Sequence, residues 1–518
     1  MMHTDRETMS RNYRYLRQRL MIVGGYLGQI LTGFGVLLVL PAVVGIIYRE
    51  GRAAGAFLVT GAVTAVVGLL LRRFMGRGRL GTREAVLLCT GAWGVCSLVA
   101  SIPMQAMLHH PYIDTLFESV SGLTTTGLTA FAGLDVVPKT VLFWRSTSQL
   151  LGGLGILSFF LLVSYQGNAA HRLFQTEASK ATVPRPVPSM RRTVIITWMI
   201  YGLLLVFNIA VLVLLRVGLF DAINYGFTTT STGGMSPHDM GLAYFRANGH
   251  PYALPIELAT MIFMALSGLN YLLLYRAITG RVKVLFTGVE ARRYWMLMLF
   301  GLALIMIESL SVPATWANLG QPTATGQIGG NVGYETWRLA SFQVVSLVST
   351  TGHVTLPLEH AFFGPAARQL FVFMLLLGGC AGSTAGGLKI VRAMVLNRSL
   401  RQEIRKLSHP EGATLPVVLE GHVLEARTVG SMAAMGSAWL IAGVVGGIII
   451  SLNSGHEALG SLSLSLSALS NVGPSLLPVG AVAALPAGSK VLLMVWMIAG
   501  RLEILPVLAL LSARTWHE

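Results

Sequence analysis

The chain has 518 residues, of which 53% are hydrophobic and only 12% are charged, and its mean hydropathy is +0.65. These proportions exclude a water-soluble protein, because too few polar residues remain to cover its surface. The formal net charge of +16 would suit a nucleic-acid-binding protein, but the placement of the basic residues argues against that class.

Apolar segments long enough to cross a bilayer core, which takes about 20 residues, recur along the whole chain. We predict spanning helices at residues 21–48, 53–71, 84–108, 140–165, 193–215, 251–275, 294–314, 365–388, 428–452 and 488–511. The first apolar segment, of about 28 residues, is too long for the core of a cleaved signal peptide. The predicted fold class is therefore an all-α polytopic membrane protein.

Basic residues lie mainly in alternate gaps between the predicted spans. If the N-terminus is cytoplasmic, 29 of the 38 lysines and arginines fall on the cytoplasmic side. The positive-inside rule then places both termini in the cytoplasm. Contact with anionic membrane lipid accounts for this charge, so we expect no nucleic-acid partner.

Four short polar stretches recur at similar spacing, and their glycines are Gly127, Gly233, Gly352 and Gly473, 106, 119 and 121 residues apart. Each stretch follows a half-polar segment that is too short to span: 112–124, 220–230, 336–349 and 456–470. Non-helical backbone at membrane depth is tolerated only where it is buried in protein or lines a watery path. We therefore predict four pseudo-symmetric helix–pore-loop–helix repeats around one central pore, with the first two transmembrane helices as an extra N-terminal pair.

The predicted units follow from this repeat. They are the N-terminal pair (1–80), pore repeat 1 (81–190), pore repeat 2 (191–290), pore repeat 3 with a glycine-rich intramembrane loop at 378–387 (291–425), and pore repeat 4 (426–518).

The four polar stretches contain Thr, Ser, Asn and Gly but no charged side chain. A glycine-bearing extended strand can point its carbonyl oxygens inward, and carbonyl oxygens replace the water shell of a monovalent cation. Acidic residues lie near the outer ends of the half-polar segments, where they either cap the helix or also raise the local cation concentration. These acids are Asp114, Glu118, Asp221, Glu335 and Glu457.

Several further motifs carry a resemblance to a known family. They are FWRSTSQLLGGLGIL (143–157), GGCAGSTAGGLKIVR (378–392), NVGP (471–474) and GRLEILP (500–506). With the four glycine stretches in register, residues 84–511 resemble the Trk/Ktr/HKT superfamily of potassium transporters. The extra N-terminal pair suits its bacterial TrkH type better than the eight-helix Ktr type.

The resemblance implies a potassium-binding selectivity filter. Its K⁺ ligands would be Thr125, Thr126, Gly127, Ser231, Thr232, Gly233, Thr350, Thr351, Gly352, Asn471, Val472 and Gly473. Glycine at all four filter positions resembles the potassium-selective branch. His353 departs from the family pattern, and we interpret it as a solvated neighbour of the filter, with pH sensitivity as the alternative.

The resemblance also implies a gate beneath the filter. The gate residues would be Gly378, Gly379, Gly382, Gly386, Gly387 and Arg501. Without the resemblance, the glycines would indicate close helix packing. Arg501 is either a positive barrier in the pore or one member of a structural salt bridge.

Other polar residues in the spans have local interpretations. Arg145 is expected to snorkel to the outer surface, and Gln149 and Asn270 to make interhelical hydrogen bonds. Glu308 is the main candidate for a proton relay. The three cysteines (Cys89, Cys96 and Cys380) lack metal or disulfide spacing and are expected to be buried.

The function implied is potassium uptake across the bacterial inner membrane by a protein that is not an enzyme. No phosphate-binding motif occurs, so we expect no nucleotide binding by this chain itself. The resemblance implies a cytoplasmic nucleotide-binding regulatory subunit of the TrkA type as a partner. A homodimer is also implied, and K⁺ is the transported ion with no cofactor. Channel and symport mechanisms both remain open. Sodium or mixed transport and the potassium-binding subunit of a potassium-pumping ATPase are the alternatives.

Overall fold

A computed structural model describes residues 2–504, 507, 508 and 510, apart from residues 77, 79, 166–189, 312–331, 411–414 and 420. The basic gap that follows the fourth predicted span, at residues 166–189, lies outside this described part.

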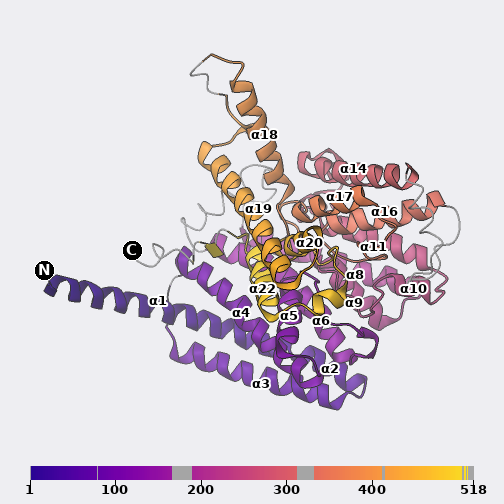
Figure 1. The fold of residues 1–518 in the computed structure, drawn as a ribbon. Coiled ribbons are helices and arrows are strands. Elements are labelled where there is room, and N and C mark those ends of the chain that lie inside the picture. The colour runs from indigo at the N-terminus through magenta and orange to yellow at the C-terminus, as the bar shows by residue number, and fades with distance from the viewer. Residues whose placement is uncertain are drawn as a thin grey trace.

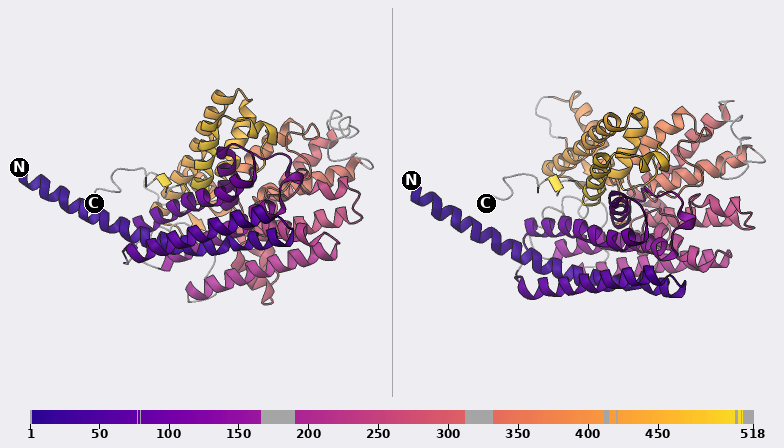
Figure 2. Two further views of the ribbon diagram at one scale, coloured as in Figure 1. Left: turned by 90° about the horizontal axis from the view of Figure 1, so that it is seen from below. Right: turned by 60° about the horizontal axis from the view of Figure 1, so that its bottom comes forward.

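The chain begins with three helices that lie along one edge of the molecule (Figure 1), namely α1 (Met2–Leu37), α2 (Val39–Ile47) and α3 (Gly51–Phe74). The N-terminal end of α1 projects away from the body in both views of Figure 2. Helices α1 and α3 approach closely at Gly35 and Gly61, and the absence of side chains there allows it. A side chain at either glycine would collide with backbone atoms of the opposite helix.

Polar and aromatic contacts attach helices α1 to α3 to the rest of the chain. Glu50 accepts hydrogen bonds from the backbone N–H groups of Lys139 (2.8 Å) and Thr140 (2.9 Å), which lie at the start of the later helix α6 (Lys139–Tyr165). The Trp144 ring packs edge-on against Phe34 and Phe57, with ring centroids 5.9 and 5.8 Å away.

Four units follow, and each contains a long helix, a short helix and a second helix. The first unit contains α4 (Thr82–Met107), α5 (Tyr112–Leu123), the 3-10 turn η1 (Leu134–Val136) and α6 (Lys139–Tyr165). The second contains α8 (Met190–Leu214), α9 (Leu219–Thr230), α10 (Ala243–Ala247), α11 (Ala253–Ser267), α12 (Tyr271–Ile278) and α13 (Val284–Thr287).

The third unit contains α14 (Val289–Ser311), α16 (Val332–Val348), α17 (Pro365–Leu376), α18 (Ile390–Lys406) and the two-residue antiparallel strands β1 (Val418–Leu419) and β2 (His422–Val423). The fourth contains α19 (Ala426–Ser454), α20 (Ala458–Leu469), α21 (Val479–Ala483) and α22 (Ala487–Arg501). Helix α18 projects from the body on the side opposite α3 (Figure 1).

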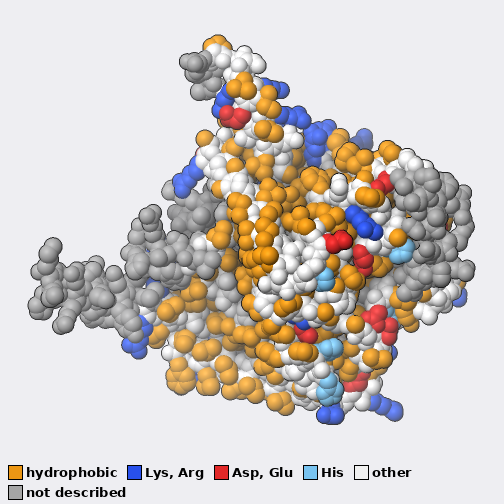
Figure 3. Space-filling model, viewed as in Figure 1, with side chains coloured by type: hydrophobic (Ala, Val, Ile, Leu, Met, Phe, Trp, Pro, Cys, Tyr) orange, Lys and Arg blue, Asp and Glu red, His pale blue; other side chains and the backbone are white. Residues whose placement is uncertain are grey.

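Within the described residues, six helices are long and apolar enough to cross a membrane. They are Arg17–Ile47, Gly51–Phe74, Arg83–Met107, Ile195–Leu214, Val289–Ser311 and Ala426–Ser454. Many of their large apolar side chains are exposed, including Val59 and Val63 of α3. Figure 3 shows the hydrophobic surface that results, and this surface suits contact with lipid.

Three predicted spans are not single straight helices, and for two of them the prediction gave no break. In the third, 365–388, the helix ends just before the glycine-rich loop predicted at 378–387. In the span predicted at 251–275, α11 and α12 meet at 109°. The Asn270 side chain accepts from Leu272 N–H (2.8 Å) and starts α12 in a new direction. Helix α17 ends at Leu376, just before paired glycines, and α22 ends at Arg501. The equivalent helix of the first unit, α6, continues without a break.

The four short helices α5, α9, α16 and α20 are buried among the long ones. In α20, nine of its twelve residues are buried, including four serines. Such helices cannot face lipid, so the long helices enclose them. All four end at a common structural feature, which is the candidate site.

Candidate functional site

Each short helix ends in the same tight turn. The N–H groups of Thr125, Thr232, Thr350 and Asn471 bond to the carbonyl three residues earlier, at 3.0, 3.1, 3.0 and 3.3 Å. The N–H group of each following residue bonds to the carbonyl five residues earlier, at 2.9, 2.8, 2.9 and 3.0 Å. This pair of bonds is the Schellman pattern of helix C-termini. The negative ends of four helix dipoles therefore converge on four short strands.

These strands, which we call the glycine ring, are residues 125–127, 232–234, 350–352 and 471–473. The ring closes through glycine-to-carbonyl contacts. A side chain on Gly127 would collide with the carbonyl oxygen of Gly233, and one on Gly234 with that of Thr351.

The same contact continues around the ring. A side chain on Gly352 would meet the carbonyl oxygen of Val472, and one on Gly473 would meet that of Thr126. The strand of every repeat therefore touches the next one in order, and the fourth returns to the first. Glycine is required at these positions by space and also by backbone angle, because φ is +80°, +72°, +81° and +104° in chain order.

The second strand lies one residue later than the sequence analysis placed it. Gly234 has the positive φ and the ring contact, whereas Gly233 occupies the middle position equivalent to Thr126. Ser231 is the C-cap of α9 with right-handed angles, so it precedes the ring. The stretch TTTSTGG contains two adjacent glycines, and only the turn geometry distinguishes them.

The first residue of every strand is strained. Thr125, Thr232, Thr350 and Asn471 have φ between +52° and +55°, a left-handed conformation that usually belongs to glycine. For a β-branched threonine it costs on the order of 1–2 kcal/mol. Strain of this kind persists only where the surrounding structure enforces it, and it clusters at functional sites.

The glycine-rich loop 378–387 contacts the helix-end side of the ring. Gly386 N–H donates to the Thr350 hydroxyl (2.8 Å), and the Thr384 hydroxyl donates to the carbonyl of Thr230 (3.3 Å). A side chain on Gly386 would collide with the carbonyl of Ser470. The loop thus touches three of the four helix ends. It contains the five predicted gate glycines Gly378, Gly379, Gly382, Gly386 and Gly387.

Helices outside the ring hold this loop in place. Cys380 N–H donates to the carbonyl of Gly268 (2.9 Å), and Tyr271 N–H donates to the carbonyl of Gly382 (3.2 Å). Glu290 of α14 accepts from Ala381 N–H (2.7 Å).

Arg501 lies at the end of α22, directly against the loop, and is 3% exposed. Its guanidinium donates to the carbonyls of Thr384 (3.2 Å) and Gly152 (2.9 Å). No ion pair to Arg501 occurs among the described residues. Glu503, its near neighbour in sequence, pairs with Arg392 instead (2.5 Å). The salt-bridge interpretation of Arg501 therefore fails in the described part of the chain.

The acids at the outer ends of the short helices are mostly paired. Asp114 is buried against Lys490 of α22. Glu335 pairs with Arg338 (2.7 Å), and Arg338 also reaches Glu257 of α11 (2.9 Å). These ion pairs join the first repeat to the fourth and the second to the third. Paired acids hold helices together, so the pairing of Asp114 and Glu335 argues against the alternative that they raise the local cation concentration.

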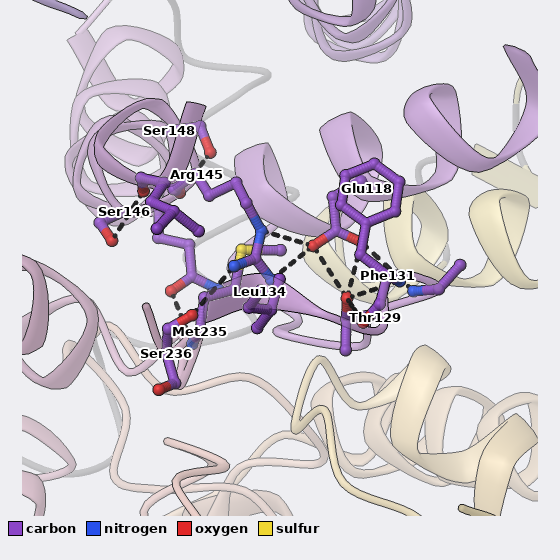
Figure 4. A network of polar contacts seen from close by, with 12 residues as sticks. Glu118, Thr129, Phe131, Leu134, Arg145, Ser146, Ser148, Met235 and Ser236 are labelled. Atoms are coloured by element: carbon purple, nitrogen blue, oxygen red, sulfur yellow. Dashed lines mark hydrogen bonds and ion pairs between the residues drawn. The ribbon is translucent and has the colours of Figure 1, made fainter. Parts of the chain in front are cut away.

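Glu118 and Arg145 form the most buried pair, with side chains 0% and 2% exposed. Arg145 Nε lies 2.7 Å and its Nη2 2.6 Å from Glu118 Oε1, and its Nη1 donates to the carbonyl of Ser236 (2.9 Å). Glu118 also accepts from the Thr129 hydroxyl (2.9 Å) (Figure 4). Arg145 therefore does not snorkel, because a buried carboxylate holds it behind the ring.

Two other assignments change. His353 is 1% exposed, and its Nε2 lies 3.0 Å from the hydroxyl of Thr229. It fills the space between the second and third repeats and is not solvated. Glu308 accepts from Ala366 N–H (2.8 Å) and Ala367 N–H (2.7 Å), so it caps α17.

Asp221 was named from the sequence, but the outer cluster that it forms with His238 and Asp135 was missed. His238 Nδ1 lies 2.7 Å from Asp135 of η1, and its Nε2 lies 3.4 Å from Asp221 of α9. Burial lowers the pKa of His238, but the two carboxylates outweigh it, and the pKa lies above its ordinary value. Lys490, Glu257 and Arg338 were missed as well. The one signal in the sequence that could have found these residues is that charged side chains are rare in apolar segments and usually have a partner there.

Four short helices aimed at one ring, enclosed by apolar long helices, define a multi-pass membrane protein built of pore-loop repeats. Comparison with known proteins identifies its family. The TrkH family profile, described as "Cation transport protein", matches residues 56–517. The chain therefore belongs to the TrkH family of cation transport proteins and is not an enzyme.

Relatives match along nearly the whole chain. The Trk system potassium uptake protein TrkH of Salmonella typhimurium is 31% identical over 95% of this chain and 98% of its own length. The protein of the same name from Escherichia coli is 30% identical over 95% and 98%. The crystal structure of the potassium transporter TrkH from Vibrio parahaemolyticus has a TM-score of 0.80 and 28% identity, covering 96% of this chain and 99% of that one.

The Glu118–Arg145 pair makes a first prediction. Arg145→Met leaves a buried carboxylate without its cation and should lower the free energy of unfolding by about 3–5 kcal/mol. The double variant Glu118→Gln, Arg145→Met should recover much of that loss, as thermal unfolding in detergent can measure. Arg19→Met is the control, since Arg19 pairs with Glu84 at a partly exposed site and should cost about 1 kcal/mol or less. Equal losses for the two single variants would contradict this assignment.

The outer histidine makes a second prediction. Because the pKa of His238 is raised in the folded protein, its ion pairs stabilise fully below the ordinary histidine pKa of about 6.5 and are lost as the pH rises through the raised value. The stability difference between wild type and His238→Asn should therefore shrink with rising pH. Thermal unfolding over a pH series measures it, with His422→Asn, at an exposed site, as the control. A pH-independent difference would rule out the pairing.

Proposed function

We propose that the chain takes up potassium ions across the bacterial inner membrane, with the glycine ring as its selectivity filter. The observation that carries this proposal is the closure of four glycine strands against one another's carbonyl groups. Carbonyl oxygens gathered at one point replace the water shell of a monovalent cation. Four helix C-terminal ends add negative potential there. The names of the relatives, which are potassium uptake proteins, support the choice of ion.

The proposed ion ligands follow the structural register. They are residues Thr125, Thr126, Gly127, Thr232, Gly233, Gly234, Thr350, Thr351, Gly352, Asn471, Val472 and Gly473. Relative to the sequence analysis, Gly234 is added and Ser231 becomes the residue before the strand. Glycine at every closing position supports selectivity for potassium over sodium. By the family resemblance, members that prefer sodium have serine at this position of the first repeat.

We also propose that loop 378–387 and Arg501 form the gate. The loop contacts three helix ends beneath the ring, and a guanidinium with only carbonyl partners lies against it. A fixed positive charge repels a cation on the same path. Movement of the loop away from the ring would therefore also displace or break the hydrogen bond between Arg501 and the Thr384 carbonyl.

The remaining elements of the proposal concern assembly. We infer a cytoplasmic regulatory subunit of the TrkA type, a homodimer, and cytoplasmic termini. The projecting helix α18 supports the first of these, because exposed basic residues line it, among them Arg401 and Arg405. Lys and Arg gather over this end of the molecule in Figure 3. The division into an N-terminal pair (1–80) and four pore repeats belongs to the same proposal.

The ring makes a third prediction, which tests the function. Gly127→Ser should reduce the preference for K⁺ over Na⁺ at least about tenfold, since the new side chain displaces the Gly233 carbonyl. Rubidium uptake into proteoliposomes, with K⁺ or Na⁺ as competitor, measures that preference. Gly133→Ser is a matched control: Gly133 has φ +79°, but the nearest atom to its added side chain is 3.8 Å away. An unchanged preference in Gly127→Ser would refute the filter.

Arg501 makes a fourth prediction. Unit charges about 8 Å apart at an effective dielectric near 20 repel by roughly 2 kcal/mol, so Arg501→Ala should raise basal flux by up to roughly 30-fold. Arg501→Gln removes the charge but keeps an amide donor for the Thr384 carbonyl. A rise in both variants identifies charge as the barrier, and a rise in Arg501→Ala alone identifies the loop contact. Unaltered flux per folded molecule in both variants would contradict the gate assignment.

A further inference from the structure

We propose that Gln149 of α6 is a positioning residue that determines ion selectivity by holding one carbonyl of the glycine ring. This inference rests on the proposed function of the ring. Gln149 is fully buried, and Arg145 lies one helical turn before it. Gln149 crosses from the first repeat to the strand of the second, and Arg145 crosses to Ser236, two residues after that strand.

The geometry of Gln149 is that of a two-point clamp. Its amide Nε2 donates to the carbonyl of Gly233 (2.7 Å), and its Oε1 accepts from the N–H of Met235 (3.1 Å). The two backbone partners determine which end of the amide is which, because a carbonyl only accepts and an N–H only donates. A side chain on Gly233 would collide with Gln149, so this residue and its glycine fit together.

Gln149 also makes the ring asymmetric. The carbonyls of Thr126, Thr351 and Val472 occupy the same position in the other repeats, and none of them accepts a hydrogen bond from a described residue. Of these four carbonyls, only that of Gly233 accepts a hydrogen bond from a donor among the described residues. A bonded carbonyl is held in direction and is less available to an ion.

The other ring junctions are filled differently. Asn471 donates to the Thr126 hydroxyl (2.9 Å) between the fourth and first repeats. His353 contacts the Thr229 hydroxyl between the second and third. Neither bonds to one of the four carbonyls at the glycine contacts, although His353 also bonds to the backbone of Gly234, the next residue of the second strand. The carbonyl geometry of the second strand therefore depends on a side chain outside the ring, and discrimination between two ions of different size depends on carbonyl geometry.

Two variants test this inference. Gln149→Leu keeps the approximate size and Gln149→Met keeps the approximate length, and both remove the donor to Gly233 and the acceptor for Met235 N–H. We expect each to lower the preference for K⁺ over Na⁺ by about fivefold, the effect of one hydrogen bond of typical net strength. Rubidium uptake with K⁺ or Na⁺ as competitor measures it, alongside thermal unfolding in detergent.

Gln343→Leu is the matched control. Gln343 is a fully buried glutamine of α16 that donates to the carbonyl of Leu356 (2.6 Å), outside the ring. Gln343→Leu should lower the free energy of unfolding without changing the K⁺/Na⁺ ratio, because Gln343 bonds to no carbonyl of the ring. An equal change of ratio in Gln343→Leu would overturn the inference.

The result for Gly127→Ser separates this inference from the proposed function. If Gly127→Ser loses selectivity while both Gln149 variants retain the wild-type ratio, the filter stands and the role of Gln149 is refuted. If Gly127→Ser and the Gln149 variants all retain the ratio, the proposed filter itself is refuted. Should Gln149→Leu fail to fold, the ratio in Gln149→Met decides alone.

Discussion

The contact between a glycine and the carbonyl of the following repeat is the constraint on which the rest of the molecule depends. It occurs four times, between segments more than one hundred residues apart, and it closes on itself. A closed ring requires all four short helices to end at one depth and in one turn. The Schellman pattern at the four helix ends meets this requirement, at the expense of left-handed angles at three threonines and an asparagine.

The groups behind the ring do not share its symmetry. Repeats 4 and 1 are joined by an acid on the short helix and a lysine on α22, as in Asp114 with Lys490. Repeats 2 and 3 are joined with the polarity reversed, by Arg338 on the short helix and Glu257 on α11. In both cases an ion pair joins a short helix to a helix of the neighbouring repeat, but the charge on the short helix is negative in one and positive in the other. Each repeat has adapted to its neighbours, and only the backbone of the ring stays alike.

Much of this architecture is predictable from sequence, since apolar length, positive charge and the fourfold glycine pattern depend on local composition. The fold class was predicted from these features and is confirmed. Other features depend on the partner of a residue across the fold. The register at Gly233 and Gly234, the break between α11 and α12, and the pairing of Arg145 with Glu118 are of this kind. Nothing in the stretch around Arg145 distinguishes a buried cation from one that reaches the surface.

The pairing of the acids on the short helices also bears on how an ion would arrive. Exposed carboxylates would draw cations from a distance, and salt would screen that attraction over a Debye length of about 8 Å at physiological ionic strength. Here Asp114, Glu118 and Glu335 are each neutralised inside the protein. These acids therefore supply little long-range field at the entrance. Of the five acids at the outer ends of the short helices only Glu457 is exposed, so any salt-dependent attraction of cations by this set would come mainly from that one charge.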